Sequence, residues 1–196
     1  IDSEVSDTEA VVSTIVSDNY DAGVQCAKDM MKKKTSANII IVNQKALNSI
    51  NERVKGFRDT IKGHPQYKIV EEKESAAEFE IAMKVMEKII YEKKNYDVVM
   101  GGNDPIALGC IAAMQMTDKT DQVMVYGVDG SPDGKAMIKA GFLEGTAAQS
   151  PIKIGEKAVQ TAYSYLAGET VKKHVTIPVE LITADNLKFY DMTGWQ

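Results

Sequence analysis

Short runs of β-branched and other apolar residues alternate along this chain with longer stretches of helical periodicity. Strands separated by helices of about ten residues or more predict βαβ crossovers and a mostly parallel sheet. The runs are apolar throughout, which is typical of strands that helices cover on both faces. We therefore expect an α/β fold with a doubly wound, mostly parallel sheet flanked by helices. The strands are predicted over residues 11–16, 38–42, 67–71, 96–100, 122–128, 145–148 and 175–182, and the helices over 18–33, 50–61, 76–91, 105–116, 132–140 and 151–166.

Residues at the ends of the helical stretches support this division. Asp18, Asp104 and Ser131 stand where an N-cap is expected, because a short polar side chain there accepts a hydrogen bond from a free helical amide. Glycine adopts the left-handed conformation that is common just after a helix. It follows three of the stretches, at Gly63, Gly141 and Gly168.

Composition narrows the classes of function. The 196 residues carry a formal charge of −5, which argues against binding to nucleic acid through a basic surface. No Cys/His cluster has the spacing of a metal site, so we expect neither a metal nor another cofactor. Cys26 and Cys110 fall on apolar helix faces and are predicted to be buried, whereas His64 and His174 are predicted to be solvated. No apolar run reaches about 18 residues, the length that spans a membrane.

Polar residues gather at the carboxyl ends of the expected strands, where open α/β sheets bind their ligands. Carboxylate, amide and guanidinium groups can each form paired hydrogen bonds with neighbouring hydroxyls. No histidine, cysteine or paired carboxylate in an acid/base arrangement accompanies them. The pattern favours a binding protein for a neutral polyhydroxylated ligand over an enzyme. The residues are Asp18, Asn19, Arg53, Asn103, Asp129 and Gln149.

Each of these residues also has a purely structural interpretation. Asp18 could act only as an N-cap, and Asn103 and Asp129 could simply shape turns beside their glycines. Arg53 on a helix is, taken alone, more often a surface cation than a ligand-binding group. Their common position at strand ends is the reason to prefer the binding interpretation.

Five segments in register resemble the ribose-type sugar-binding proteins, the solute-binding components of bacterial ABC importers and relatives of LacI-type repressor cores. The segments are 12–23 (VSTIVSDNYDAG), 51–57 (NERVKGF), 102–109 (GNDPIALG), 126–130 (YGVDG) and 145–151 (GTAAQSP). The tail, at 181–187 (LITADNL) and 194–196 (GWQ), is also similar. The resemblance implies a lobe of the periplasmic-binding-protein-like type I fold.

The resemblance also implies roles for individual residues. Arg53 resembles the arginine that clamps sugar hydroxyls, Asn103 the asparagine at its strand end, Asp129 the carboxylate that takes two hydroxyls, and Gln149 the glutamine near the hinge.

Two positions depart from the pattern of ribose binders. The aromatic that usually precedes the aspartate is replaced by Val128, and the other aromatic wall falls at Ala77, with Phe79 nearby. Because these rings stack on the sugar, their loss leaves the identity of the ligand open.

A division of the chain follows from the same resemblance, since the family has two lobes joined by three crossings. Residues 18–149 are expected to form a C-terminal ligand-binding lobe. Residues 1–17, with the hinge strand, and residues 150–178 are expected to be remnants of an N-terminal lobe, and residues 179–196 the last crossover and tail. The chain would then be a fragment, and helix 151–166 would expose an apolar face that favours self-association.

The resemblance implies extracytoplasmic binding of a sugar for delivery to the membrane permease subunits of an ABC importer, in the periplasm or as a cell-surface lipoprotein of a Gram-positive bacterium. Two alternatives have the same fold. One is the effector-binding core of a LacI-type regulator, and the other is the ligand-sensing domain of a membrane receptor. The tail over residues 181–196 favours the importer.

Overall fold

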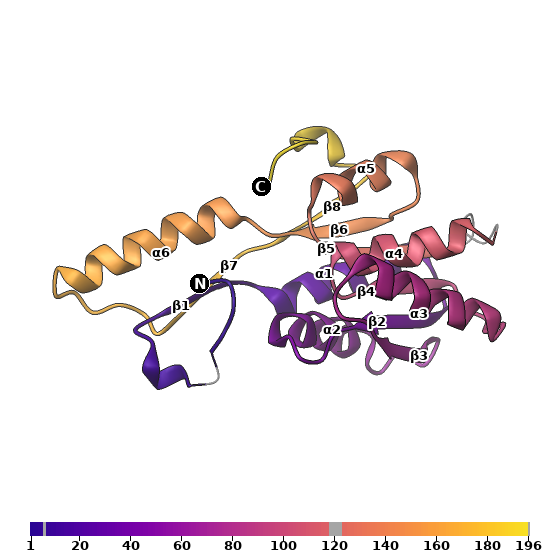
Figure 1. Ribbon diagram of the computed structural model, residues 1–196, viewed down its shortest axis with the longest axis horizontal. Helices are drawn as coiled ribbons and strands as arrows, with labels where there is room; N and C mark the ends of the chain where they lie inside the picture. Colours follow the sequence, from indigo (N-terminus) through magenta and orange to yellow (C-terminus); the bar gives the residue numbers. More distant parts are fainter. Residues whose placement is uncertain (6, 118–122, 196) are drawn as a thin grey trace.

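The computed structural model describes residues 1–5, 7–117 and 123–195, which form a larger body and a narrow arm (Figure 1). The body is built on a six-stranded sheet in the order β3-β2-β4-β5-β6-β8, parallel except where β8 pairs antiparallel with β6. This confirms the expected α/β fold. The strands are β2 (Ala37–Asn43), β3 (Tyr67–Glu74), β4 (Val98–Gly101), β5 (Met124–Asp129), β6 (Gly145–Ala148) and β8 (Glu180–Thr183).

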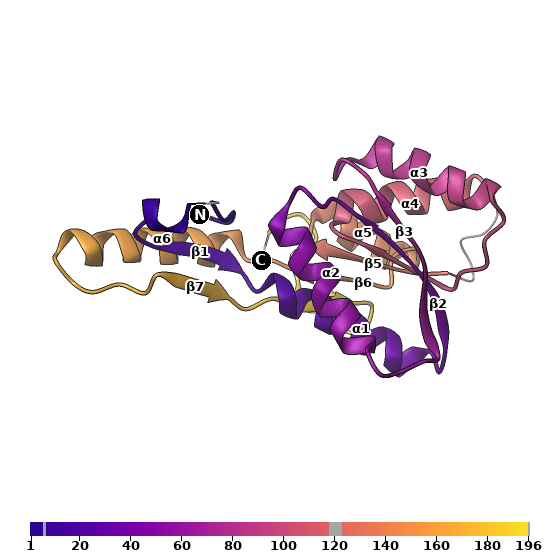
Figure 2. The ribbon, with the colours of Figure 1, turned by 90° about the horizontal axis from the view of Figure 1, so that it is seen from below.

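Helices cover both faces of this sheet. One face carries α1 and α2, and the other carries α3, α4 and α5 (Figure 2). The isoleucines of β2 and the valines of β4 are completely buried between the two layers, which explains why these strands lack polar alternation. The bounds are α1 (Asn19–Lys33), α2 (Asn48–Ile61), α3 (Phe79–Tyr91), α4 (Asp104–Gln115) and α5 (Pro132–Ala140).

The arm consists of two parallel strands, β1 (Thr14–Ser17) and β7 (His174–Ile177), and the long helix α6 (Pro151–Leu166). A small core of Ile15, Ile154, Ala158 and Ile177 joins them. The rest of α6 is open to solvent, and its exposed side chains include Val159, Tyr163 and Leu166. Among the described residues, no helix is both long enough and apolar enough to cross a membrane.

Three connections join the arm to the body, and hydrogen bonds tie them together. They run from β1 to α1, from β6 to α6 and from β7 to β8. The Asp18 N–H donates to the Ile177 carbonyl (2.9 Å), which links the first connection to the third. The Ser17 hydroxyl donates to Gln149 Oε1 (2.9 Å), which links the first to the second.

Several boundaries differ from the sequence predictions. The run over 11–16 becomes a strand only from Thr14, and the single extended run over 175–182 is two strands in different sheets, because Pro178 cannot continue a ladder. The helix expected from residue 76 begins at Phe79, since Ala77 has a positive φ of 57°. Residue 122, the expected start of β5, lies outside the described residues.

The helix-end predictions are confirmed with one exception. Asp18 and Ser131 cap α1 and α5, and the three glycines after helices have φ between 81° and 85°. Asp104 was expected to be an N-cap, and that is wrong: Asn103 caps α4 by accepting from the Ile106 N–H (3.0 Å). Cys26 and Cys110 are buried as predicted.

Candidate ligand-binding site

The connections of the sheet reverse direction between β2 and β4, at the carboxyl ends of these strands. From β2 the chain passes through α2 to β3, whereas from β4 it passes through α4 to β5 on the other side. Open α/β sheets bind ligands at such a switch point. Arg53 of α2 lies at this switch point, only 5% exposed, and its Nη1 donates to the Gly102 carbonyl just after β4 (2.9 Å).

Arg53 and four other polar residues form a closed ring of contacts. Arg53 Nε donates to Asn19 Oδ1 (2.9 Å), and Asn19 Nδ2 donates to the Ser17 carbonyl (3.2 Å). The Ser17 hydroxyl contacts Gln149 (2.9 Å), and Gln149 Nε2 donates to Asp129 Oδ1 (2.7 Å). The same Asp129 oxygen lies 3.5 Å from Arg53 Nη1 and completes the ring. Residues from the ends of β1, β5 and β6 are thus joined to α1 and α2.

Burial shifts the pKa values of the two charged groups in this ring, Arg53 and Asp129, more than their mutual attraction does. Burial lowers the pKa of Arg53, while the nearby carboxylates of Asp129, Asp104 and Asp2 oppose that shift. Burial likewise raises the pKa of Asp129 to about 7, with Arg53 opposing the shift and Asp104 adding to it. At 3.5 Å the pair does not fully offset the desolvation of either charge. Additional hydrogen bonds from a ligand would therefore stabilise both groups.

The backbone at Asp129 is unusual. Its φ is 144°, and the next residue, Gly130, has φ 71°. A positive φ at a residue other than glycine persists only where surrounding contacts hold it, and such positions cluster at ligand sites.

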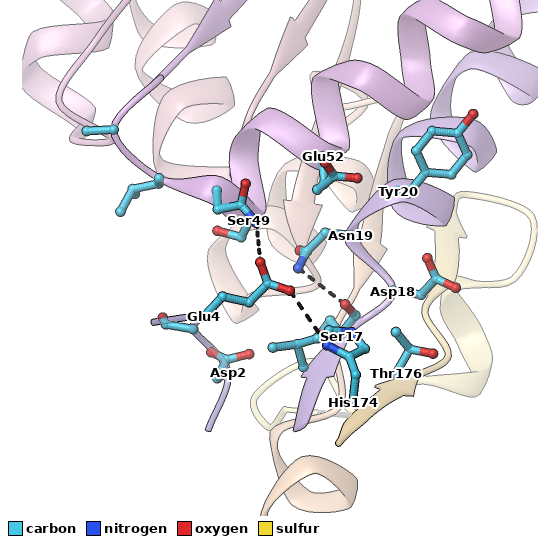
Figure 3. Close-up of a pocket in the computed structure, with 15 residues that line it drawn as sticks. Asp2, Glu4, Ser17, Asp18, Asn19, Tyr20, Ser49, Glu52, His174 and Thr176 are labelled. Carbon is cyan, nitrogen blue, oxygen red and sulfur yellow. Dashed lines mark hydrogen bonds and ion pairs between the residues drawn. The ribbon is translucent and has the colours of Figure 1, made fainter. Parts of the chain in front are cut away.

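A cavity of about 350 Å³ opens beside the ring, between the arm and the body (Figure 3). Ser17 and Asn19 belong to both the ring and the cavity wall. Glu4 reaches across the opening: its carboxylate accepts from Asn48 Nδ2 of α2 and lies 3.7 Å from His174 Nδ1 of β7. The other labelled lining residues are Asp2, Asp18, Tyr20, Ser49, Glu52 and Thr176. The wall therefore contains four carboxylates, which suits a neutral or cationic ligand better than an anionic one.

The structure brings most of the predicted site residues together. Arg53, Asn19, Asp129 and Gln149 lie in the ring, as described above. Asp18 lines the cavity, and its carboxylate also caps α1 by accepting from the Asp21 N–H (3.0 Å).

The other predicted residues lie outside the ring. Asn103 follows Gly102, the residue that Arg53 contacts, but its carboxamide oxygen is engaged as the cap of α4. Val128 is completely buried in the core of the body. Phe79 lies in an apolar groove between α3, α4 and α5, away from the ring.

Sequence reasoning missed several residues of the cavity. The strand-end rule does reach Ser17, which ends β1 as Asp129 ends β5, but Ser17 was not among the expected ligand-binding residues. Asp2 and Glu4 lie in a segment without periodicity, and they reach the site because the chain folds back so that the Asp2 N–H donates to the Ile15 carbonyl (2.7 Å). His174, predicted to be solvated, is half-exposed and faces Glu4.

Carboxylate, amide and guanidinium groups thus lie together at the switch point of an open sheet, the place where such sheets bind ligands. Among the described residues, no group of histidine, cysteine and acidic side chains could hold a metal ion. Residues 1–170 match the family described as periplasmic binding protein domain. The chain belongs to this family.

Two similar proteins are named as import binding proteins. The ribose import binding protein RbsB of Salmonella typhimurium is 31% identical over 175 residues, which cover 88% of this chain and 58% of that protein. The D-apiose import binding protein of Paraburkholderia graminis is 31% identical over 196 residues, covering 98% of this chain and 62% of the relative. This chain thus spans less than two thirds of the length of either relative.

A solved structure agrees closely in fold. It is an ABC transporter solute binding protein from Bacillus halodurans with bound myo-inositol, with a TM-score of 0.89 and 25% identity. The match covers 96% of this chain and 66% of that one.

Proposed function

We propose that the chain is the larger part of an extracytoplasmic sugar-binding protein that delivers its ligand to an ABC importer. The observation that carries this proposal is the buried Arg53–Asp129 pair in a ring of amides and a hydroxyl beside a cavity. A monosaccharide presents several hydroxyls at fixed spacing, and each group of the ring can pair with them. The names of the ribose and D-apiose import binding proteins support the same class of ligand.

Binding would exchange contacts within the ring for contacts with the ligand. Asp129 accepts from two ligand hydroxyls, and Arg53 donates to hydroxyl or ring oxygens. The ligand thereby adds the hydrogen bonds that the Arg53–Asp129 pair, 3.5 Å apart, does not provide. Gln149 and Asn19 both donate and accept, which suits hydroxyls of either orientation. We propose binding without catalysis, in keeping with relatives that are named as binding proteins.

The proposed division of the chain follows its two sheets. Residues 18–149 are the ligand-binding lobe, residues 1–17 and 150–178 belong to a second, N-terminal lobe, and residues 179–196 form the last crossover and tail. In support, the arm holds β1, β7 and α6, whose exposed face has no cover among the described residues. We assign this face to the remainder of the N-terminal lobe, and self-association is the alternative occupant.

The proposed partners are a sugar and the membrane permease subunits of the importer, with no nucleic acid. The proposed location is the periplasm, or the cell surface with the protein held as a lipoprotein. The family and the named import proteins support a location outside the cytoplasm.

A thermal-shift assay tests the proposed function. D-ribose, D-apiose, D-allose and myo-inositol would each be added to the chain. One of them is expected to raise the Tm by several degrees, because a ligand at about 100 times its Kd adds about 2.7 kcal/mol of stability. The variant Arg53→Ala serves as the control and should show a much smaller shift at the same sugar concentration. Absence of a shift in this chain and in the protein with a complete N-terminal lobe would contradict the proposal.

The raised pKa of Asp129 predicts a pH dependence of binding. Ligand hydroxyls donate to the ionised carboxylate, so affinity is expected to fall as the pH drops below about 7, the pKa of this carboxyl. In the ligand-free protein, the pH affects the stability in the opposite direction, since stability rises as the pH falls. The folded state binds more protons than the unfolded state between the ordinary pKa of 3.8 and about 7, so the free energy of unfolding decreases as pH rises through that window.

Calorimetric titrations at several pH values would measure this dependence, together with urea denaturation of the ligand-free protein. The variant Asp129→Asn is the matched control, because it cannot titrate and should lose the pH dependence. Constant affinity in the original chain between about pH 5 and about pH 8 would exclude the assignment.

A further inference from the structure

Asp104 is a completely buried carboxylate that the proposed binding mechanism does not use. It occupies the first turn of α4, directly after Asn103. Its Oδ2 accepts from both the N–H (2.9 Å) and the hydroxyl (2.7 Å) of Ser131, and its Oδ1 accepts from the Thr146 hydroxyl (2.6 Å). Three donors converge on it, and they and Arg53 favour the ionised carboxylate, although burial raises the pKa of this carboxyl overall.

Two glycines make room for this carboxylate. A Cβ atom at Gly127 would lie 2.4 Å from Asp104 Oδ1, and a Cβ atom at Gly134 would lie 2.4 Å from Oδ2. The side chain is therefore enclosed by the backbones of β5 and α5 as well as by its hydrogen-bond donors. A longer acidic side chain does not fit there.

The donors to Asp104 flank the turn that carries Asp129. Ser131 ends this turn and caps α5. Thr146, the other donor, itself accepts from the Gly130 N–H (3.0 Å). Contacts on Gly130 and Ser131 thus hold the segment in which Asp129 adopts a φ of 144°. Such a conformation needs external contacts to persist.

We propose that Asp104 is a positioning residue for ligand binding, which holds the turn that presents Asp129 and sets the electric field at its carboxylate. This inference rests on the proposed function, because the role of Asp129 in binding is itself proposed there. Asp104 acts through the turn and through space, and the ligand contacts Asp129.

The charged and titratable groups around the two carboxylates come from several elements. Arg53 on α2 lowers the pKa of Asp129, and Asp104 on α4 raises it. The charge of Asp104 also acts on Cys26 of α1 and Lys135 of α5. Replacing Asp104 by a neutral residue of the same shape should therefore lower the pKa of Asp129.

The first test needs no ligand. The side-chain carboxyl carbon of Asp129 would be followed by NMR during a pH titration of the original chain and of Asp104→Asn. The midpoint for Asp129 is expected at lower pH in the variant. Because burial also raises the pKa of Asp129, a variant that only loosens the structure would lower the midpoint as well. Thr146→Val is therefore titrated as the control, since it removes a contact of the same turn but leaves the charge of Asp104, and its midpoint is expected to stay near that of the original chain. An unchanged or higher midpoint in Asp104→Asn, or an equal shift in Thr146→Val, would overturn the field part of the proposal.

The second test uses a conservative pair at Thr146. Thr146→Val removes the hydroxyl that bridges Asp104 and the Gly130 N–H, while Thr146→Ser keeps it. Affinities for D-ribose and myo-inositol would be measured at about pH 8.5, where Asp129 is ionised in every variant. Asp104→Asn and Thr146→Val are each expected to weaken binding about tenfold, and Thr146→Ser to stay within about twofold of the original chain.

The outcomes separate the inference from the proposed function. Equal affinities for Thr146→Val and Thr146→Ser would overturn the positioning role, even where Asp104→Asn does not fold. If the original chain and the protein with a complete N-terminal lobe bind no sugar, the proposed function fails. The NMR titration still decides whether Asp104 sets the field at Asp129.

Discussion

Replacing Arg53 by alanine is expected to weaken sugar binding by about 2–4 kcal/mol, or roughly 30- to 1,000-fold in Kd. The guanidinium contacts Asn19 and the Gly102 carbonyl and lies 3.5 Å from Asp129. Its removal leaves the Asp129 carboxylate buried without its cationic partner and frees Asn19 to turn away. The loss therefore includes the misplaced neighbours as well as the missing donors.

Calorimetric titration of Arg53→Ala with the sugar that stabilises the original chain would measure this loss. Arg58→Ala is the matched control, because Arg58 lies on the same helix with a side chain 39% exposed and pairs with Glu72 away from the ring. Its affinity should equal that of the original chain. A folded Arg53→Ala protein with unchanged affinity would refute the placement of the ligand at the ring.

Replacing Gly23 by alanine is expected to lower the free energy of unfolding by about 3 kcal/mol. A Cβ atom at Gly23 would lie 1.8 Å from the Arg53 carbonyl oxygen, and one at Gly56 would lie 2.0 Å from the Tyr20 carbonyl oxygen. The two helices α1 and α2 thus approach backbone to backbone, and an added methyl group must push them apart. Because the contacted backbone is that of Arg53, ligand affinity should fall as well.

Urea denaturation would measure this change. Gly155→Ala provides the control, since Gly155 is also helical but a Cβ atom there has nothing within 4 Å. Alanine at that position should raise the free energy of unfolding by about 0.5–1 kcal/mol, as helix propensity predicts. If Gly23→Ala is as stable as the original chain, the close approach of α1 and α2 is wrong.

The strands and helices of the body could be predicted because short stretches of sequence determine them. The uninterrupted apolar run in β2 is explained by two covering layers, and glycines with positive φ end the helices at the expected places. The predictions were wrong where pairing between segments far apart in the sequence decides the structure. Whether residues 175–182 form one strand or two depends on which sheet each half joins, and periodicity does not carry that information.

Part of the candidate site could also be predicted, by the rule that ligands bind at the carboxyl ends of parallel strands. That rule selected Arg53, Asp129 and Gln149, which the structure joins in one ring. Asp2 and Glu4 approach the cavity through a long-range fold-back, so no local pattern indicates them. The N-cap of α4 was predicted one position too late, at Asp104. The cap is Asn103, and the Asp104 side chain points into the core, where it accepts from the Thr146 hydroxyl.

In the proposed binding mode, the closed ring means that side chains of the protein already pair with the groups that a sugar would contact. Gln149 and Asn19 occupy the acceptors and donors that hydroxyls would take, so uptake of a ligand is an exchange of partners rather than a gain of new ones. Each exchange contributes little enthalpy by itself, but a molecule that meets only some of the groups leaves the rest unpaired. Such a site binds more weakly any ligand that pairs with only part of the ring. It favours compact rigid polyols that contact every member of the ring at once.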